Sequence, residues 1–341
     1  MEDLLNTILS SYKSYARYLW SELKNPSWDN YFYWLLFVSS VFLILEWTNP
    51  WRKTQAKFRK DFWLDLFYIF FNFFLFSLIV YAALSRIVVN FVNDSFYQLF
   101  HLDLTKINPL YGAPLWVVLM IGFIVRDFIQ WWVHRLLHKV PFLWKFHQVH
   151  HSVEQMGFAA HLRFHWMETV VYRTIEYLPL AFLGIGLYDF FIIHIFTLSF
   201  GHYNHSNLSI PGKWVGLMIG GLLGIAVISS SFDIMLLKNA PLEFSLFTFI
   251  LFCFIGYYIL GPKVKYIFNS PEMHIWHHGY EMPPDRPDGI NFGLTLSIWD
   301  YLFKTAYIPH NGRDLKLGFP GVENFPNRFW GQVIHGLVRK K

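Results

Sequence analysis

Long apolar runs separated by short polar segments dominate the chain. A bilayer-spanning helix needs roughly 20 apolar residues, and four stretches approach that length: about 32–48, about 64–90, about 114–133, and the pair 214–232 and 244–261 counted as one hairpin. The predicted fold is therefore an all-α integral membrane protein. It would have about three N-terminal transmembrane helices and an extra transmembrane hairpin.

A further apolar stretch, residues 169–201, is interrupted by Gly184-Ile185-Gly186. Each arm of about 15 residues would be about 22 Å long at a rise of 1.5 Å per residue, which is short for a full crossing. We expect a re-entrant or interfacial hairpin that returns to the side it started from.

Composition supports a membrane protein and narrows the available chemistry. The chain of 341 residues is 54% hydrophobic and 21% aromatic with only 15% charged residues, and its mean hydropathy is +0.31. These values argue against a soluble protein. Because Cys253 is the single cysteine, neither a disulfide framework nor a cysteine zinc finger can form, and a metal would have to use imidazole or oxygen ligands. The acidic start of the chain predicts that there is no cleavable signal peptide.

The basic residues indicate how the chain is oriented rather than a nucleic-acid partner. The net charge is +5, but the cations sit at the ends of hydrophobic runs and not on one polar face. Five of them fall in the loop after the first apolar run, which the positive-inside rule places in the cytoplasm: Arg52, Lys53, Lys57, Arg59 and Lys60. Counting crossings from that loop puts residues 91–113 outside and every histidine cluster on the cytoplasmic face.

Eight histidines form three spaced sets just beyond the apolar runs. Spacings of three and four place side chains on one face of a helix, so each set can direct two or three imidazoles toward a common point. Two such faces could surround a metal pair, and imidazole suits iron, zinc, copper and nickel alike. The sets are His134 and His138, then His147, His150 and His151, then His274, His277 and His278. A single histidine here could be an interfacial anchor, but three clusters favour a site.

Asp127 lies on the same helical stripe as His134 and His138, seven and eleven residues before them. Its carboxylate could accept the second ring N–H of a ligating histidine and fix its tautomer. The alternative is a helix-end carboxylate paired with Arg126 or Arg135.

Five segments of the chain resemble the fatty acid hydroxylase/sterol desaturase superfamily of membrane non-haem di-iron oxygenases. They read "DFIQWWVHRLLHKVPFLWKFHQVHHS", "LRFHWMET", "NHSN", "MHIWHH" and "NFGLTLSIWDYLFKTAY", within about 120–210 and 262–320. The resemblance implies two iron ions, O₂, and a lipid C–H bond as the target. It also implies that His165 and His205 join the eight clustered histidines as metal ligands.

Two departures from the superfamily pattern stand out. Trp166 replaces the family's proline after His165, and residues 211–261 insert an extra hydrophobic hairpin. His161 and His202 are spaced so that they could ligate or support the metal. Asp300 matches a family position of structural role, and His194 is expected to be a core histidine.

The resemblance divides the chain into six parts: an N-terminal amphipathic segment (1–31), transmembrane helices (32–133), the first part of the catalytic domain with the re-entrant hairpin (134–210), the inserted transmembrane hairpin (211–261), the second part of the catalytic domain with the last histidine box (262–320), and a C-terminal tail (321–341). The histidine-rich dimetal site would lie in a cytoplasmic helical cap.

No haem or flavin motif is present, so a cytochrome b5-like or ferredoxin-like donor would supply electrons, docking on Lys139, Lys145 and Arg163. The membrane would be the endoplasmic reticulum in a eukaryote or the inner membrane in a bacterium, with lipids and no nucleic acid as partners.

Two other function classes fit part of the pattern. A zinc hydrolase would need only three or four ligands, and no HExxH segment supplies a general base; zinc could still occupy imidazole sites adventitiously. A metal transporter or sensor would carry its ligands inside the spanning helices, whereas here they follow the helix ends. The sequence favours a lipid hydroxylase or desaturase over both.

Overall fold

The structure is a computed structural model that describes residues 2–28, 30–72, 91, 93–101, 103, 106, 108–233 and 242–337. Throughout these residues the secondary structure is helical, and the only β pairing is two isolated bridges. The predicted all-α fold is confirmed.

The α-helices are α1 (Glu2–Lys24), α2 (Tyr31–Thr48), α3 (Phe62–Phe70), α5 (Leu115–Lys139), α6 (Pro141–His151), α7 (Trp166–Phe182), α8 (Leu187–His205), α9 (Gly212–Asp233), α10 (Leu242–Ile255), α11 (Val264–Ile267), α12 (Pro271–His277), α13 (Ile298–Leu302) and α14 (Phe329–Val333). Short helical turns complete the list: η3 (Phe158–Leu162), η4 (Gly256–Leu260), η5 (Gly261–Lys263) and η6 (Val322–Asn324).

Within the described residues, three helical stretches are long and apolar enough to cross a membrane: Tyr31–Thr48, Leu115–Lys139 and Leu242–Ile267. The first two coincide with predicted spans, and the third contains the second arm of the predicted hairpin. In α9 only the shorter segment Gly212–Ile225 is comparably apolar. Of the span predicted at about 64–90, the described part forms α3, and residues 73–90 lie outside the described residues.

The boundary between α5 and α6 falls at Val140 and Pro141. α5 ends at Lys139, Val140 is extended, and Pro141 is the first residue of α6. Proline suits a first helical position, since its missing N–H would have no intrahelical partner there, but it breaks a helix that tries to continue through it. The segment is therefore divided into two consecutive histidine-bearing helices, α5 and α6.

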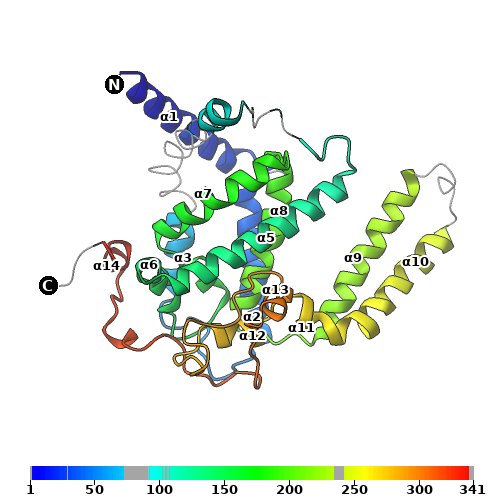
Figure 1. Ribbon diagram of the computed structural model, residues 1–341. Helices are drawn as coiled ribbons and strands as arrows, with labels where there is room; N and C mark the ends of the chain where they lie inside the picture. The colour runs from blue at the N-terminus through cyan, green and yellow to red at the C-terminus, as the bar shows by residue number, and fades with distance from the viewer. Residues whose placement is uncertain are drawn as a thin grey trace.

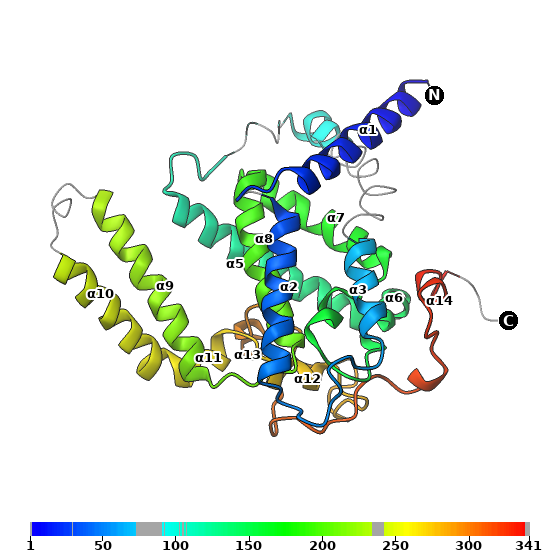
Figure 2. The same ribbon diagram turned by 180° about the vertical axis from the view of Figure 1, so that it is seen from behind.

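The apolar stretch at 169–201 is likewise divided between two helices, α7 and α8, at the predicted glycines. Gly184 has φ 69°, a left-handed conformation that glycine adopts without steric cost. Asp189 then accepts a hydrogen bond from the Gly186 N–H at the start of α8. α5 packs against α7 and α8, and α2 packs against α8 (Figure 2). The pair of arms is present; its re-entrant character stays a prediction.

The α9–α10 hairpin stands away from the other helices (Figure 1). Its two arms pack backbone against backbone: a Cβ added to Gly216 would lie 2.2 Å from the carbonyl oxygen of Gly256. Close approach through small residues is how helices associate where lipid removes the hydrophobic driving force. The insertion is thus a self-contained element attached to one side of the molecule.

Candidate metal centre

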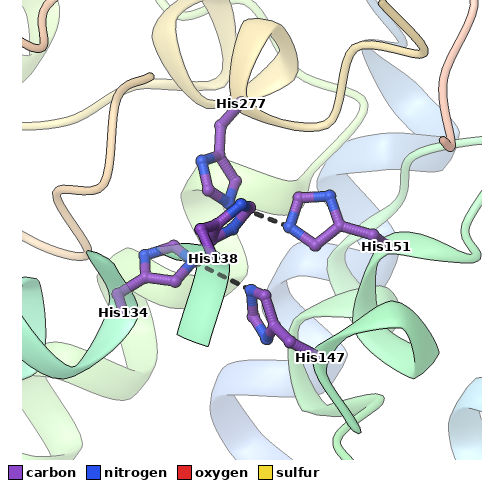
Figure 3. Close-up of side chains that lie close together, drawn as sticks. All are labelled: His134, His138, His147, His151 and His277. Atoms are coloured by element: carbon purple, nitrogen blue, oxygen red, sulfur yellow. Dashed lines mark hydrogen bonds between the residues drawn. The ribbon is translucent and has the colours of Figure 1, made fainter. Parts of the chain in front are cut away.

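Nine histidines converge where α5, α6, α8 and the segment of α12 meet. They form two groups, in each of which one ring nitrogen per residue lies within 4.8 Å of the others. The five-histidine group, drawn in Figure 3, is His134, His138, His147, His151 and His277. The four-histidine group is His150, His205, His274 and His278. The structure thus brings together nine of the ten predicted ligands, from segments up to 144 residues apart.

Hydrogen bonds fix the tautomers in the five-histidine group. His134 Nδ1 donates to the Phe292 carbonyl and His277 Nδ1 to the Ile290 carbonyl, both at 2.8 Å. A ring that donates through Nδ1 carries a bare lone pair on Nε2. These lone pairs point inward: His134 Nε2 lies 3.2 Å from His147 Nε2, and His277 Nε2 lies 3.1 Å from His151 Nε2 (Figure 3).

The four-histidine group repeats the arrangement. His205 Nδ1 donates to the Gly201 carbonyl at 2.8 Å, and His150 Nδ1 lies 3.3 Å from the Arg163 carbonyl. The Nε2 atoms again face one another: His205 lies 3.1 Å from His150 and 3.0 Å from His274. When each of these rings carries its proton on Nδ1, the facing Nε2 lone pairs can bind one electron-pair acceptor between them, such as a metal cation.

The spacing of these nitrogens fits a metal cation. Two imidazole nitrogens at about 2.1 Å from one ion and at right angles are about 3.0 Å apart, close to the separations found in both groups. In addition, His138 Nε2 and His278 Nδ1 are buried and have no hydrogen-bond partner in the part of the chain that the structure describes. An unsatisfied buried nitrogen is costly unless it binds something. Both groups therefore have the donor chemistry of a metal site.

Burial keeps the rings neutral. It lowers the pKa of His147, His150 and His151 well below the usual value, and neighbouring rings lower each pKa further because two imidazolium charges would repel. The same causes lower the pKa of His274 and His278. Neutral imidazole is the form that binds metals, so the site needs little proton release at neutral pH.

Glu168 orients one of the ligands; its sequence position near the clusters fits either such a supporting carboxylate or a surface one. Its Oε2 accepts from His147 Nδ1 at 2.7 Å, and its Oε1 accepts from the His165 N–H at 3.2 Å. A carboxylate behind a ligating histidine fixes the ring and makes it a stronger donor. The available signal was its position three residues after the helix cap, where a capping-box glutamate belongs.

His165 is the predicted ligand that joins neither group. Its Nε2 donates to the Val333 carbonyl at 2.7 Å, and its Nδ1 accepts from the Met167 N–H at 3.1 Å as the cap of α7. With both ring nitrogens engaged, His165 has no lone pair to offer a metal in this arrangement.

His161 and His202 lie beside the four-histidine group and bond to each other. Their Nδ1 atoms are 2.9 Å apart, and His202 Nε2 is 3.0 Å from Ser39 Oγ. The His161 ring centroid is 5.2 Å from that of His205. Of the two roles predicted for this pair, the placement favours support over ligation.

Asp127 anchors a loop rather than a histidine. Its carboxylate accepts from the backbone N–H groups of Thr295 and Leu296 at 3.1 and 3.2 Å, and from Trp299 Nε1 at 2.9 Å. Neither the predicted bond to a ligating histidine nor the predicted pairing with an arginine is found among the described residues, since both oxygens face the loop.

Asp300 anchors the other side of the same loop. It accepts from the N–H groups of Phe292 and Gly293 at 2.8 Å and from Trp131 Nε1 at 3.0 Å. It thereby positions the Phe292 carbonyl, which accepts the hydrogen bond from His134 Nδ1. The two aspartates act on the metal centre through the loop at 290–300, as a structural role for Asp300 would require.

Arg163 is not available for docking. It is fully buried and pairs with Asp65, which also accepts from Arg59. The prediction of an exposed cationic contact is wrong here, because the side chain turns inward beneath the histidines. Lys139 and Lys145 are exposed, as expected.

The comparisons with known proteins bear on this centre directly. Residues 119–224 match the family model for fatty acid hydroxylase. These residues are the part of the chain that is similar to that family. The predicted resemblance to the fatty acid hydroxylase/sterol desaturase superfamily is confirmed. The match contains six of the nine grouped histidines, and α12 with the residue that follows it, His278, supplies the other three from beyond the inserted hairpin.

Two curated relatives are lipid-modifying enzymes by name. The chain is 24% identical over 227 residues to "Ornithine lipid hydroxylase OlsE" of Rhizobium tropici, covering 67% of this chain and 52% of that protein. It is 26% identical over 217 residues to "Alkylglycerol monooxygenase" of Xenopus tropicalis, covering 63% and 36% respectively. The chain thus spans about half or less of the length of these relatives. No solved structure matches it.

A largely apolar cavity of about 520 Å³ lies among α1, α2, α5, α7 and α8. Five ligand candidates form one end of it: His134, His147, His150, His205 and His274. A second cavity of about 430 Å³ reaches His138 and His151, and is lined by residues of the 279–289 and 318–320 loops. The centre is therefore approached by an apolar cavity among the helices and by a separate loop-lined one.

Proposed function

We propose that this chain is a membrane-bound, O₂-dependent di-iron oxidoreductase that hydroxylates or desaturates a C–H bond of a lipid, such as a sterol or a fatty acyl chain. The observation that carries the proposal is the pair of adjacent histidine groups with inward-facing Nε2 atoms 3.0–3.2 Å apart. The hydroxylase domain and the names of both relatives support a lipid as the substrate.

The imidazoles, Glu168 and the cavity lining would have separate roles in this reaction. Bound iron would supply the activation of O₂ that attack on an unactivated C–H bond requires. The nine imidazoles would hold the ions as neutral ligands, and Glu168 would keep His147 in the ligating tautomer. The apolar cavity would orient the lipid beside His134 and His205 and exclude water from the reacting carbon.

Electrons would enter from an external donor of the cytochrome b5 or ferredoxin type. The exposed cations Lys139 and Lys145 lie close in sequence to the ligands of α5 and α6 and offer a docking contact for an acidic donor. The centre would face the cytoplasm, as the positive-inside rule requires of the loop before α3. The six-part division of the chain and its assignment to the endoplasmic reticulum or the inner membrane belong to the same proposal.

Metal analysis of the purified protein tests the proposal. We expect about two irons per chain, with a Mössbauer spectrum that changes on reduction and exposure to O₂. His150→Ala should lose iron, whereas His310→Ala, which alters an exposed histidine outside both groups, should keep it. Zinc as the only metal in a protein whose function in cells is undiminished would overturn the proposal. Lipid profiling of a deletion strain would then identify the substrate by a lipid that lacks one oxygen or carries two extra hydrogens.

A further inference from the structure

A charged and polar network lines the apolar cavity at a distance from the histidines. Arg126 and Glu176 are each 3% exposed, although both lie on apolar helices. We call the following residues the cavity network: Tyr31, Arg126, Gln130, Glu176, His194 and Thr197. All six line the cavity, so a lipid inside it would meet them.

The network is closely hydrogen-bonded. Arg126 Nη1 donates to Thr197 Oγ1 at 2.7 Å, and Arg126 Nη2 lies 3.2 Å from His194 Nδ1. Gln130 Nε2 donates to Glu176 Oε1 at 2.6 Å, and the other oxygen of Glu176 lies 3.7 Å from Arg126 Nε. These contacts span α5, α7 and α8. The positive charge of the guanidinium is thereby matched by one carboxylate.

Fold stability does not account for such a network. A buried ion pair seldom contributes more to stability than apolar side chains of the same size, because desolvation offsets the attraction. Ionisable residues on membrane helices usually face a pathway or a ligand. Here the network borders an otherwise apolar cavity, which points to a ligand with a polar group.

The helix geometry sets the distance between the network and the metal centre. Arg126, Gln130 and His134 follow each other at intervals of four along α5, and Glu168, Tyr172 and Glu176 do the same along α7. Eight residues of α-helix correspond to about 12 Å. On both helices the cavity wall therefore runs from a residue of the metal centre to a member of the network over about 12 Å.

We propose that the cavity network binds an uncharged polar group of the lipid substrate, a hydroxyl or an ester oxygen, and thereby selects which carbon lies at the metal centre. An uncharged group is inferred because Glu176 already balances Arg126, so that a carboxylate or phosphate would bring an unpaired charge into the cavity. The network offers both donors and acceptors, as a hydroxyl requires. This inference rests on the proposed function, since it assigns the substrate of the same site.

Binding of three C16 probes to the full-length protein in nanodiscs tests the inference. A photoactivatable hexadecanol is cross-linked to the protein, and unlabelled hexadecanol, palmitate and hexadecane compete with it. A hydrogen bond to a charged group contributes about 1.5–3 kcal/mol, and 1.4 kcal/mol corresponds to tenfold in affinity. We therefore expect hexadecanol to compete at least about tenfold better than hexadecane, and better than palmitate.

Two variants separate the network from the cavity shape. The double variant Arg126→Met with Glu176→Gln removes both charges together, and Thr197→Val removes one hydroxyl with little change of volume. The double variant should abolish the preference for hexadecanol, and Thr197→Val should weaken it by about threefold. Ile193→Val, a buried change on α8 outside the cavity lining, should leave the preference intact. Should the double variant not fold, Thr197→Val decides alone.

The outcomes distinguish this inference from the proposed function. A hexadecanol preference that the variants abolish supports the network as a binding site even if the protein contains no iron. Equal competition by all three probes, best competition by palmitate, or an unchanged preference in folded variants overturns it. If the wild type and the double variant oxidise a lipid at the same carbon, only this inference fails, and the proposed function stands.

Discussion

At the scale of single residues, the donor and acceptor roles of the ring nitrogens decide which histidines can bind metal. His134, His277 and His205 each donate a hydrogen bond from Nδ1 to a backbone carbonyl, which leaves Nε2 free to bind at the centre. In His165 both ring nitrogens are hydrogen-bonded to the backbone, Nε2 to Val333 and Nδ1 to Met167. Spacing in the sequence cannot make this distinction, because the partners come from distant segments.

Glu168→Gln tests the orientation of His147. A neutral amide would weaken the hydrogen bond from His147 Nδ1 and make the ring a poorer ligand, so we expect about a 10–100-fold loss of iron affinity. Iron retained during dialysis against a graded series of chelators measures it. Glu154→Gln, which removes an exposed partner of Lys60, serves as the control. Equal retention in both variants would contradict the role of Glu168.

The lowered histidine pKa values predict acid lability of the metal-free protein. Each buried ring has a lower pKa in the folded state than in the unfolded state, so the unfolded state binds more protons as pH falls. The free energy of unfolding should hold above about pH 6.5 and decrease below it, by up to about 1.4 kcal/mol per pH unit for each such ring. Thermal unfolding after chelation, followed from pH 8 to pH 5, checks this. A flat midpoint over that range would be inconsistent with neutral buried rings.

At the scale of elements, local signals placed several boundaries and tertiary contacts set the remaining details. The Gly184 turn divides the apolar stretch 169–201 where the sequence indicates, and Pro141, which suits a first helical position, begins α6. The loop at 290–300 has no such local signal. Its path depends on Asp127 and Asp300, which hold it from α5 and α13 through backbone hydrogen bonds.

The close packing of α9 on α10 predicts a sharp difference between two glycines. A side chain at Gly216 would meet backbone 2.2 Å away, whereas one at Gly221 has ordinary contacts at 3.5 Å. Gly216→Val should therefore lower the thermal midpoint of the protein in detergent, and Gly221→Ala should change it little. Equal midpoints would mean that the two arms do not pack in this way in the membrane.

At the scale of the whole molecule, the fold gathers histidines from α5, α6, α8 and the α12 segment. The sequence placed all clusters on one side by counting crossings, and the structure brings them into two adjacent groups. The face of the membrane on which they lie is a separate question, because the helices alone do not distinguish the two sides.

Cysteine labelling of intact and permeabilised cells tests the sidedness. In a background with Cys253→Ser, a cysteine replacing the exposed Asp285, on the loop side of the centre, should react with an impermeant maleimide only after permeabilisation. A cysteine replacing Tyr111, which is 88% exposed and predicted to lie outside, should react in intact cells. The opposite pattern would invert the proposed topology.

The sequence alone determined the helical fold with its long apolar segments, the break at Gly184 and, by spacing, eight of the nine grouped histidines, with His205 added by the family resemblance. These features depend on local chemistry: apolar length, the geometry of proline and glycine, and the periodicity of side chains on a helix. Only the tertiary structure decided that His165 caps a helix, that Asp127 holds a loop, that Arg163 is buried and that Glu168 orients a ligand. Each of these depends on which distant atom takes up a hydrogen bond, and that is fixed only when α5, α7, α8 and the 290–300 loop pack together.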